Sequence, residues 1–128
     1  MRRIVFLFLL CFALARADAA EPPTQKLVVF FERWSAKLDD SGLAIISQAG
    51  DYAKAHPDVL VHVEGFADPE GSRKANILLT DLRTQVVMDQ LQSDGVPVPR
   101  IRGRGHGSVH FALSSQESRR VEISLGSR

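Results

Sequence analysis

The sequence GFADPEGSRKANILLTDLR, residues 65–83, gives the clearest indication of the fold. Its first part, with glycine, proline and acidic residues, is typical of a loop. Ser72 is suited to cap a helix that runs to about Ser93, where Asp94-Gly95 ends it. Four apolar residues recur at helical spacing and are predicted to form the stripe of this helix that faces the core: Ala75, Leu79, Leu82 and Val86.

Further strands and one more helix are predicted around this stretch. Apolar or alternating residues predict four strands, at residues 27–31, 59–64, 100–104 and 119–125. Asp39-Asp40-Ser41 offers a cap for a helix that His56-Pro57 ends. The predicted order is strand, helix, strand, helix, strand, strand. Because helices that join strands by crossovers usually pack on one face of a mixed sheet, we predict an α+β fold, a two-layer sandwich with two main helices on a mixed β-sheet.

The N-terminus differs from the rest of the chain in composition. Met1-Arg2-Arg3 is basic, residues 4–15 are apolar and uncharged, and Ala17-Asp18-Ala19 places small residues where a signal peptidase cleaves. This pattern predicts a secretory signal peptide at residues 1–19. An uncleaved membrane anchor is the alternative, although the apolar run is shorter than the roughly 20 residues that span a bilayer.

Removal of the signal peptide would leave a short polar lead at residues 20–25 and a domain at residues 26–126. It would also remove Cys11, the only cysteine, so no disulfide is expected in the mature chain. Leu9 and Leu10 precede Cys11 at positions where a lipoprotein signal needs small residues. We therefore expect no lipid anchor.

The charge of the mature chain argues against one class of partner. The whole chain has 16 basic and 15 acidic residues, a net charge of +1. Loss of residues 1–19 removes three basic residues and one acidic residue, which leaves about −1 and no overall attraction to nucleic acid. We expect no nucleic-acid partner and, after signal cleavage, no transmembrane segment.

Three polar residues of the predicted long helix share one side. Asn76, Thr80 and Arg83 are spaced i, i+4 and i+7, so at about 100° per residue they fall within about 60° of one another. Asp68 lies on the preceding loop, at the carboxyl end of a predicted strand, where ligands commonly bind in such sheets. A carboxylate and a guanidinium placed there can bind a ligand that carries both an amine and a carboxylate. A structural ion pair between Asp68 and Arg83 that only fixes the loop is the alternative.

The spacing of these residues resembles the signature of the OmpA-like peptidoglycan-binding domain. The matching positions are Gly65-Phe66-Ala67-Asp68, Gly71, Asn76, Leu79-Thr80 and Arg83. Other segments are also similar to that family: Phe31, Ser35-Ala36 and Leu38; then Gly95-Val96, Arg100-Ile101 and Gly105-His106-Gly107; and finally residues 118–123. The resemblance therefore covers most of the predicted domain.

The resemblance implies a function. Domains of that family hold the diaminopimelate of the peptidoglycan stem peptide without covalent chemistry, in the Gram-negative periplasm, at the cell wall or outer membrane. Carried to this chain, Asp68 is expected to bind the amine of the ligand and Arg83 its carboxylate. Asn76 would support the pocket and Arg119 would line its far side. The full set of ligand-binding residues implied in this way is Asp68, Arg83, Asn76, Gly65, Phe66, Ala67, Thr80, Arg119 and Trp34.

The chain departs from the family signature at three places. Phe66-Ala67 stands where the family has His-Thr, Ser118 replaces an Asn, and Trp34 aligns with a polar Asn or Asp. These changes predict fewer polar groups around the pocket. An OmpA-like envelope interaction module that has lost muropeptide binding is therefore an alternative function. Because no membrane anchor is expected in the mature chain, tethering to the outer membrane would need a partner protein.

A cell-wall-acting enzyme is a further alternative. Glu64, Asp68 and Glu70 are clustered carboxylates, and glycoside hydrolysis uses a pair of carboxyl groups. However, Arg83 beside Asp68 favours an ionised carboxylate, whereas an acid catalyst must be protonated. We therefore expect binding and no enzyme activity.

Three other patterns have simpler interpretations. His106 and His110 resemble two metal ligands, but no third ligand is evident, so no metal or other cofactor is expected. The glycine-rich residues 103–107 lack the Gly-Lys-Ser/Thr of a phosphate-binding loop and are interpreted as a tight bend. Five arginines form either a basic strip for an anionic wall component or the solvated face of strands: Arg100, Arg102, Arg104, Arg119 and Arg120.

Overall fold

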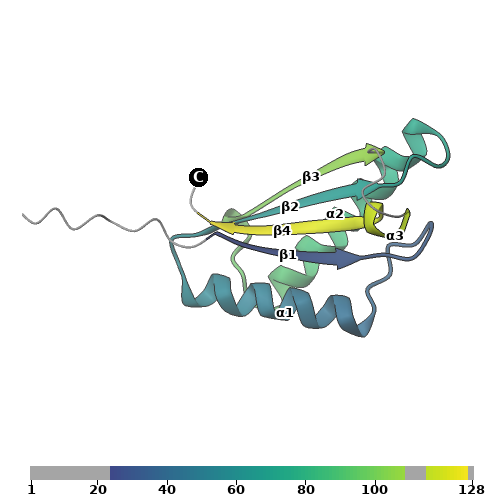
Figure 1. Ribbon diagram of the computed structural model, residues 1–128. Coiled ribbons are helices and arrows are strands. Elements are labelled where there is room, and N and C mark those ends of the chain that lie inside the picture. Colours follow the sequence, from purple (N-terminus) through teal and green to yellow (C-terminus); the bar gives the residue numbers. More distant parts are fainter. Residues whose placement is uncertain (1–23, 109–114, 127–128) are drawn as a thin grey trace, which may run out of the picture.

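Strands and helices follow one another along the part of the chain that the computed structural model describes, residues 24–108 and 115–126 (Figure 1). The strands are β1 (Gln25–Phe30), β2 (Leu60–Ala67), β3 (Ile101–Ser108) and β4 (Arg120–Gly126). The helices are α1 (Asp40–Ala55), α2 (Arg73–Ser93) and the short α3 (Ser115–Ser118), with a 3₁₀ turn at Val98–Arg100. The predicted order of strands and main helices is confirmed. The predicted signal peptide and His110 lie outside the described residues.

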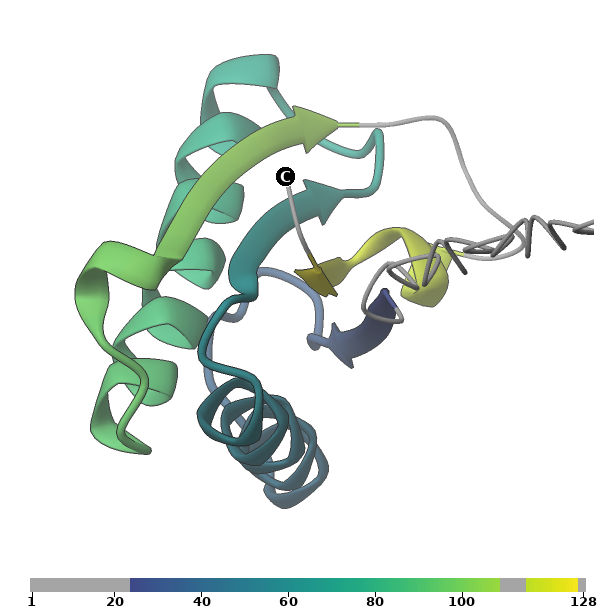
Figure 2. The ribbon, with the colours of Figure 1, turned by 90° about the vertical axis from the view of Figure 1, so that its left-hand side faces the viewer.

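The four described strands form one mixed sheet in the order β1-β4-β2-β3. β4 lies between β1 and β2 and is antiparallel to both, while β2 and β3 are parallel. Both long helices cover the same face of the sheet (Figure 2). The predicted two-layer α+β fold is therefore confirmed. Because β1, β2 and β3 run in the same direction, their carboxyl ends meet at one end of the molecule.

The core lies between this sheet and the two long helices. Residues along β2 and β4 alternate between a buried inner face and a half-exposed outer face. The fully buried aliphatic side chains of the two layers include Val61, Val63, Val121, Ile123, Ile46, Val87 and Leu91. Each such side chain contributes about 1.5–3 kcal/mol to the free energy of folding. The core between sheet and helices is therefore the main source of stability in the described part of the chain.

The first turn of α1 has the predicted cap. The backbone of Asp39 is extended, and its Oδ1 accepts a hydrogen bond from the backbone N–H of Gly42 at 2.7 Å. Replacing Asp39 by alanine removes this acceptor and is expected to lower the free energy of unfolding by about 1 kcal/mol. Urea unfolding followed by circular dichroism measures the loss. Asp58→Ala, at an exposed loop position, is the control, and an equal loss in both variants would contradict the capping role.

The face of α2 that packs on the sheet is not the predicted apolar stripe. None of the four stripe residues is fully buried, and Leu82 is 54% exposed. The buried face carries the polar side of the helix, followed by two aliphatic residues: Asn76, Thr80, Arg83, Thr84, Val87 and Leu91. The prediction was wrong because hydrophobic periodicity assumes an apolar inner face, whereas the first half of α2 buries polar groups that the protein hydrogen-bonds.

The glycine-rich segment is part of a strand and not the predicted bend. β3 continues through Gly103 and Gly105, where α2 approaches the sheet closely. A Cβ on Gly105 would lie only 2.7 Å from the backbone nitrogen of Asp81 in α2. The glycines are therefore needed for helix–strand contact, which a local pattern does not distinguish from a turn.

Candidate ligand-binding site

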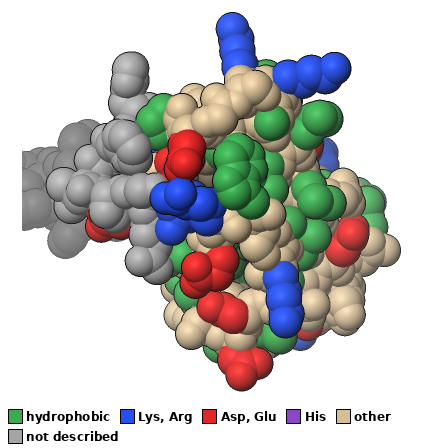
Figure 3. All heavy atoms as spheres, turned by 90° about the vertical axis from the view of Figure 1, so that its right-hand side faces the viewer, with side chains coloured by type: hydrophobic (Ala, Val, Ile, Leu, Met, Phe, Trp, Pro, Cys, Tyr) green, Lys and Arg blue, Asp and Glu red, His purple; other side chains and the backbone are tan. Residues whose placement is uncertain are grey.

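Two loops, the residue before β4 and the first half of α2 meet where β1, β2 and β3 end. Residues 31–39 follow β1, and residues 68–72 join β2 to α2. Figure 3 views this end of the molecule, where acidic and basic side chains lie close to hydrophobic ones. The site was predicted at this end of the sheet, because Asp68 directly follows β2.

A small pocket at this end brings together six of the nine predicted residues. Its lining consists of Trp34, Ala67, Asp68, Asn76, Arg83 and Arg119, together with Arg33 and Leu79. Its volume is about 10 Å³, which is room for about one water molecule. We call it the Asp68–Arg83 pocket.

Arg83 is fully buried, and the loop after β1 binds two of its nitrogens. Nε donates to the carbonyl of Ser35 at 2.7 Å, and Nη2 donates to the carbonyl of Glu32 at 2.9 Å. The guanidinium also lies over the ring of Phe31, 5.2 Å from its centroid. Nη1 is buried and has no hydrogen-bond partner among the described residues. A buried donor without a partner is costly, so this nitrogen is available for an acceptor that enters the pocket.

The surroundings of Arg83 disfavour its charge. Burial lowers the pKa of its guanidinium from its ordinary value, the nearby charge of Arg119 lowers it further and that of Asp68 raises it, with a result of about 10. Arg83 is still protonated at neutral pH, in a place where the charge is poorly compensated. A carboxylate bound at Nη1 would offset this cost, so the pocket favours an anionic group there.

Asp68 is paired with Arg119. Its Oδ2 lies 3.2 Å from Nη1 of Arg119, and both side chains are largely buried. Arg119 is held in turn by the carbonyl of Phe31, to which its Nε donates at 3.2 Å. The ion pair in the structure therefore joins Asp68 to Arg119, and not to Arg83 as the structural alternative assumed. Helical spacing could not reveal this partner, because 51 residues separate it from Asp68.

Asn76 joins three segments around the pocket. Its Nδ2 donates to the carbonyl of Glu70 at 2.8 Å and to Oγ of Ser108 at 2.7 Å. These bonds connect α2 to the loop that follows β2 and to the end of β3. The amide nitrogen of Asn76 is thus occupied by the protein itself, and the residue shapes the wall of the pocket.

Gly65 and Thr80 do not line the pocket. Thr80 Oγ1 donates to the carbonyl of Ile77 and accepts from the backbone N–H of Gly107, both at 2.9 Å. A Cβ on Gly65 would lie 2.7 Å from the carbonyl oxygen of Thr80. Both residues therefore set how closely α2 packs on β2 and β3.

Phe66 lies on the opposite face of the sheet from the pocket. Residues alternate along β2, so Ala67 is buried beside the pocket while Phe66 points away from the helices. The ring of Phe66 stacks on His106 with 4.7 Å between centroids, and the guanidinium of Arg120 lies 4.4 Å from its centroid. The departure from the family signature at Phe66 consequently removes no group from the pocket, whereas the one at Ala67 does lie in its wall.

The three clustered carboxylates do not face one another. Asp68 lies in the pocket, and Glu64 lies on the outer face of the sheet with Oε1 3.1 Å from Nε2 of His106. Glu70 is on the exposed loop, where its Oε1 lies 3.2 Å from Nη1 of Arg33. The arrangement therefore offers no pair of carboxyl groups for glycoside hydrolysis.

The five arginines do not form one basic strip. Arg100 turns toward the end of α1, where its Nη2 donates to the carbonyl of Ala53 at 2.8 Å. Arg119 lines the pocket, while Arg102 and Arg104 are exposed on β3. Of the two interpretations, the solvated strand face holds for Arg102 and Arg104, whereas Arg100 and Arg119 lie at opposite ends of the sheet and belong to no common strip.

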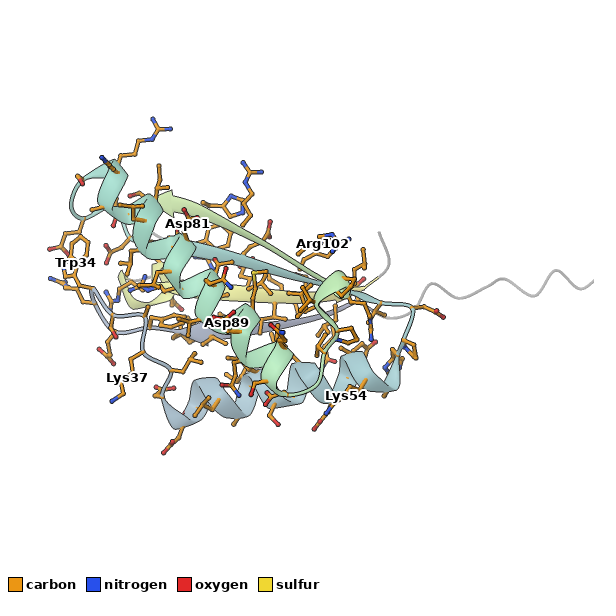
Figure 4. The ribbon with its side chains drawn as sticks, turned by 180° about the vertical axis from the view of Figure 1, so that it is seen from behind. Trp34, Lys37, Lys54, Asp81, Asp89 and Arg102 are labelled. Carbon is orange, nitrogen blue, oxygen red and sulfur yellow. The ribbon has the colours of Figure 1, made fainter. Side chains whose placement is uncertain are left out.

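Two lining residues, Arg33 and Leu79, were not predicted as part of the site. Leu79 was placed in the apolar stripe of α2, and no pattern singled out Arg33. Figure 4 shows neighbouring Trp34 beside the loop that leads into α2, far from Lys54 and Arg102 at the other end. The loop after β1 brings Arg33 and Trp34 to the pocket, and no spacing rule predicts the path of such a loop.

The fold and the pocket define a two-layer α+β domain with a buried arginine and an acidic residue at the carboxyl ends of its strands. The chain belongs to the OmpA family, whose sequence profile matches residues 30–123. The predicted family is therefore confirmed.

Individual relatives agree with this assignment. The chain is 34% identical over 101 residues to the peptidoglycan-binding protein ArfA of Mycobacterium tuberculosis, an alignment that covers 74% of this chain and 31% of the relative. It is 33% identical over 96 residues to the peptidoglycan-associated lipoprotein of Legionella pneumophila, with 66% and 54% covered. The chain thus spans about a third to a half of the length of these relatives.

A solved structure shows the same fold. The crystal structure of the peptidoglycan-associated lipoprotein from Burkholderia pseudomallei superimposes with a TM-score of 0.70. The match covers 77% of this chain and 88% of the other, at 24% sequence identity. At this level of identity the similarity concerns the arrangement of helices and strands.

Proposed function

We propose that this chain binds peptidoglycan reversibly through the diaminopimelate of the stem peptide. Membership of the OmpA family supports the proposal, as do the names of its relatives, which include a peptidoglycan-binding protein and a peptidoglycan-associated lipoprotein. One observation carries it. The buried Nη1 of Arg83, without a partner among the described residues, lies in the same pocket as the carboxylate of Asp68.

The chemistry of the ligand fits these two groups. Diaminopimelate ends in a carbon that carries both an ammonium and a carboxylate. The carboxylate would accept a hydrogen bond from Nη1 of Arg83, whose planar fork suits a carboxylate. The ammonium would donate to Asp68, beside Arg119 or in its place. A side chain that ends in an amine alone, as in lysine, leaves Nη1 unpaired and should bind more weakly.

The proposed function is binding without catalysis. Among the residues that the structure describes, Asp68 is the only acidic one that lines the pocket, and its carboxylate is bound by the guanidinium of Arg119. Hydrolysis of the glycan would need a second carboxyl group at the site. The relatives, too, are named for binding to peptidoglycan or association with it.

We also propose a location in the cell envelope. The pattern of residues 1–19 supports export to the periplasm, and a domain at residues 26–126 would then meet the cell wall, with an outer-membrane partner protein where tethering is needed. Two of the relatives are lipoproteins by name. No helix within residues 24–108 and 115–126 combines the length and the apolar character needed to cross a membrane.

Replacing Asp68 by asparagine tests the site directly. The change keeps the shape of the side chain and removes its charge, and it is expected to weaken binding of a diaminopimelate-containing peptide by about 10- to 100-fold. Isothermal titration calorimetry measures the dissociation constant. Asp58→Asn, an exposed aspartate just before β2 at the opposite end of that strand, is the matched control and should bind like the wild type.

The outcomes separate the three candidate functions. Retention of the Asp68→Asn variant on purified sacculi, equal to that of the wild type, would refute the site. A folded wild type that sacculi do not retain at all would favour an OmpA-like envelope interaction module. Release of muropeptides from the sacculi would favour a cell-wall-acting enzyme.

A further inference from the structure

The Asp68–Arg83 pocket is too small for the ligand proposed for it. Its volume of about 10 Å³ holds about one water molecule, whereas an amino acid end group contains several heavy atoms. Nη1 of Arg83 is itself buried, so part of the lining must move before a carboxylate can reach it. Residues 32–35, which we call the gate, carry the contacts that close this end of the pocket.

The gate is attached to the opposite wall of the pocket by an ion pair. Nη1 of Arg33 lies 3.2 Å from Oε1 of Glu70, on the loop that joins β2 to α2. About half of each side chain is exposed, at 56% and 51%. Because an exposed pair of this kind shifts an equilibrium by a factor of up to about five, it can hold a segment closed without locking it.

Trp34 lies across the same two loops. Its indole approaches Gly71 so closely that a Cβ there would lie 2.5 Å from Cη2 of Trp34. Its backbone has φ of 53°, in the left-handed region that side chains other than glycine seldom adopt. The closed gate therefore keeps Trp34 in an unfavourable backbone conformation, which the surrounding contacts must compensate and which opening would relieve.

Arg83 connects the gate to the ligand. Its Nε and Nη2 donate to the carbonyls of Ser35 and Glu32, which are the two ends of the gate. A carboxylate that takes two parallel hydrogen bonds from the guanidinium needs a second nitrogen besides Nη1. Nη2 can provide that bond with its second N–H while its first donates to the carbonyl of Glu32, so one guanidinium would hold both the gate and the ligand.

We propose that residues 32–35 form a gate over the pocket, that the Arg33–Glu70 ion pair holds it closed, and that Arg83, which binds both ends of the gate, links it to the ligand. The proposal rests on the proposed function for the identity of the ligand. The contacts that hold the gate closed lie within the protein and can be tested without the ligand. Trp34, Arg33 and Glu70 thus control access to the site by fixing the position of the gate.

Trp34 is the only tryptophan of the chain, so its fluorescence reports on the gate. Trp34 is already 51% exposed, so Glu70→Gln and Arg33→Gln, which each remove the ion pair, are expected to raise its acrylamide quenching in the free protein by up to about twofold. Stopped-flow mixing with a diaminopimelate-containing peptide should show association up to about fivefold faster in both variants. Asp51→Asn removes an exposed ion pair of α1, with Lys54 at 3.5 Å, and is the matched control without effect.

The two readouts separate the gate from the ligand. Unchanged quenching and unchanged association rates in both gate variants would overturn the gate, even if the wild type binds the peptide well. Increased quenching in both variants of a protein that binds no peptide would support the gate and refute the proposed ligand. Equal increases in Asp51→Asn would overturn the gate, because the effect would then be one of surface charge in general.

Discussion

Replacing Arg83 by lysine is expected to abolish retention on sacculi and to lower the free energy of unfolding by about 2–4 kcal/mol. Lysine keeps the positive charge but has a single nitrogen in place of the planar fork. Arg83 donates to the carbonyls of Ser35 and Glu32 from two nitrogens and still has Nη1 in the pocket. A single lysine nitrogen cannot reach both carbonyls and a ligand carboxylate in the same arrangement. The loss of binding and the loss of stability therefore share one cause.

Urea unfolding and a sacculus pull-down at a temperature well below the melting point measure the two effects. Arg104→Lys, at an exposed position of β3, is the matched control and should change neither. A lysine variant that unfolds like the wild type and binds sacculi equally well would show that the guanidinium has neither role. A lysine variant that is as stable as the wild type but does not bind sacculi would show that Arg83 contributes to ligand binding and not to folding.

Replacing Gly65 by alanine is expected to destabilise the fold by about 2–3 kcal/mol, although it adds a single methyl group. The new Cβ would lie 2.7 Å from the carbonyl oxygen of Thr80 and even closer to Oγ1 of Thr84. The first of these is backbone of α2, so the helix itself must shift. The shift would also displace Arg83, and binding should weaken together with stability.

Gly50 provides the control for this substitution. It is also buried, but a Cβ there would make ordinary contacts, with Asp94 at 3.4 Å and Val96 at 3.8 Å. Because alanine favours a helix over glycine, Gly50→Ala should be neutral or stabilising by up to about 1 kcal/mol. Thermal unfolding compares the two variants, and an equal loss of stability in both would mean that close packing at Gly65 is not the cause.

Local signals in the sequence were sufficient for the element order and the helix caps. Asp39 and Ser72 cap α1 and α2 as predicted, because a cap is a contact between residues three apart. The inner face of α2 was predicted wrongly for the opposite reason. Arg83 and Asn76 are buried there through partners 48 and 32 residues away, which no local period reveals.

The sequence predicted part of the lining of the candidate pocket, but not which of its charged residues pair. The family signature named Asp68, Asn76, Arg83 and Arg119, and all four line one pocket. It did not indicate that Asp68 pairs with Arg119 in the structure. The signature also included Phe66, which alternation along β2 places on the other face of the sheet. The spacing of a family signature thus identifies residues near the site. Which face of the sheet each side chain points to depends on its position in the strand.

The pairing of β1 with β4 has a mechanical consequence. Gln25 lies opposite Leu125, so the described domain begins and ends at neighbouring points, and both lie at the end of the sheet away from the pocket. A tether attached at either point and a wall polymer held in the pocket would pull in opposite directions along the strands. Such a load acts on the hydrogen bonds between β1 and β4 in shear, so they resist together and do not open one by one.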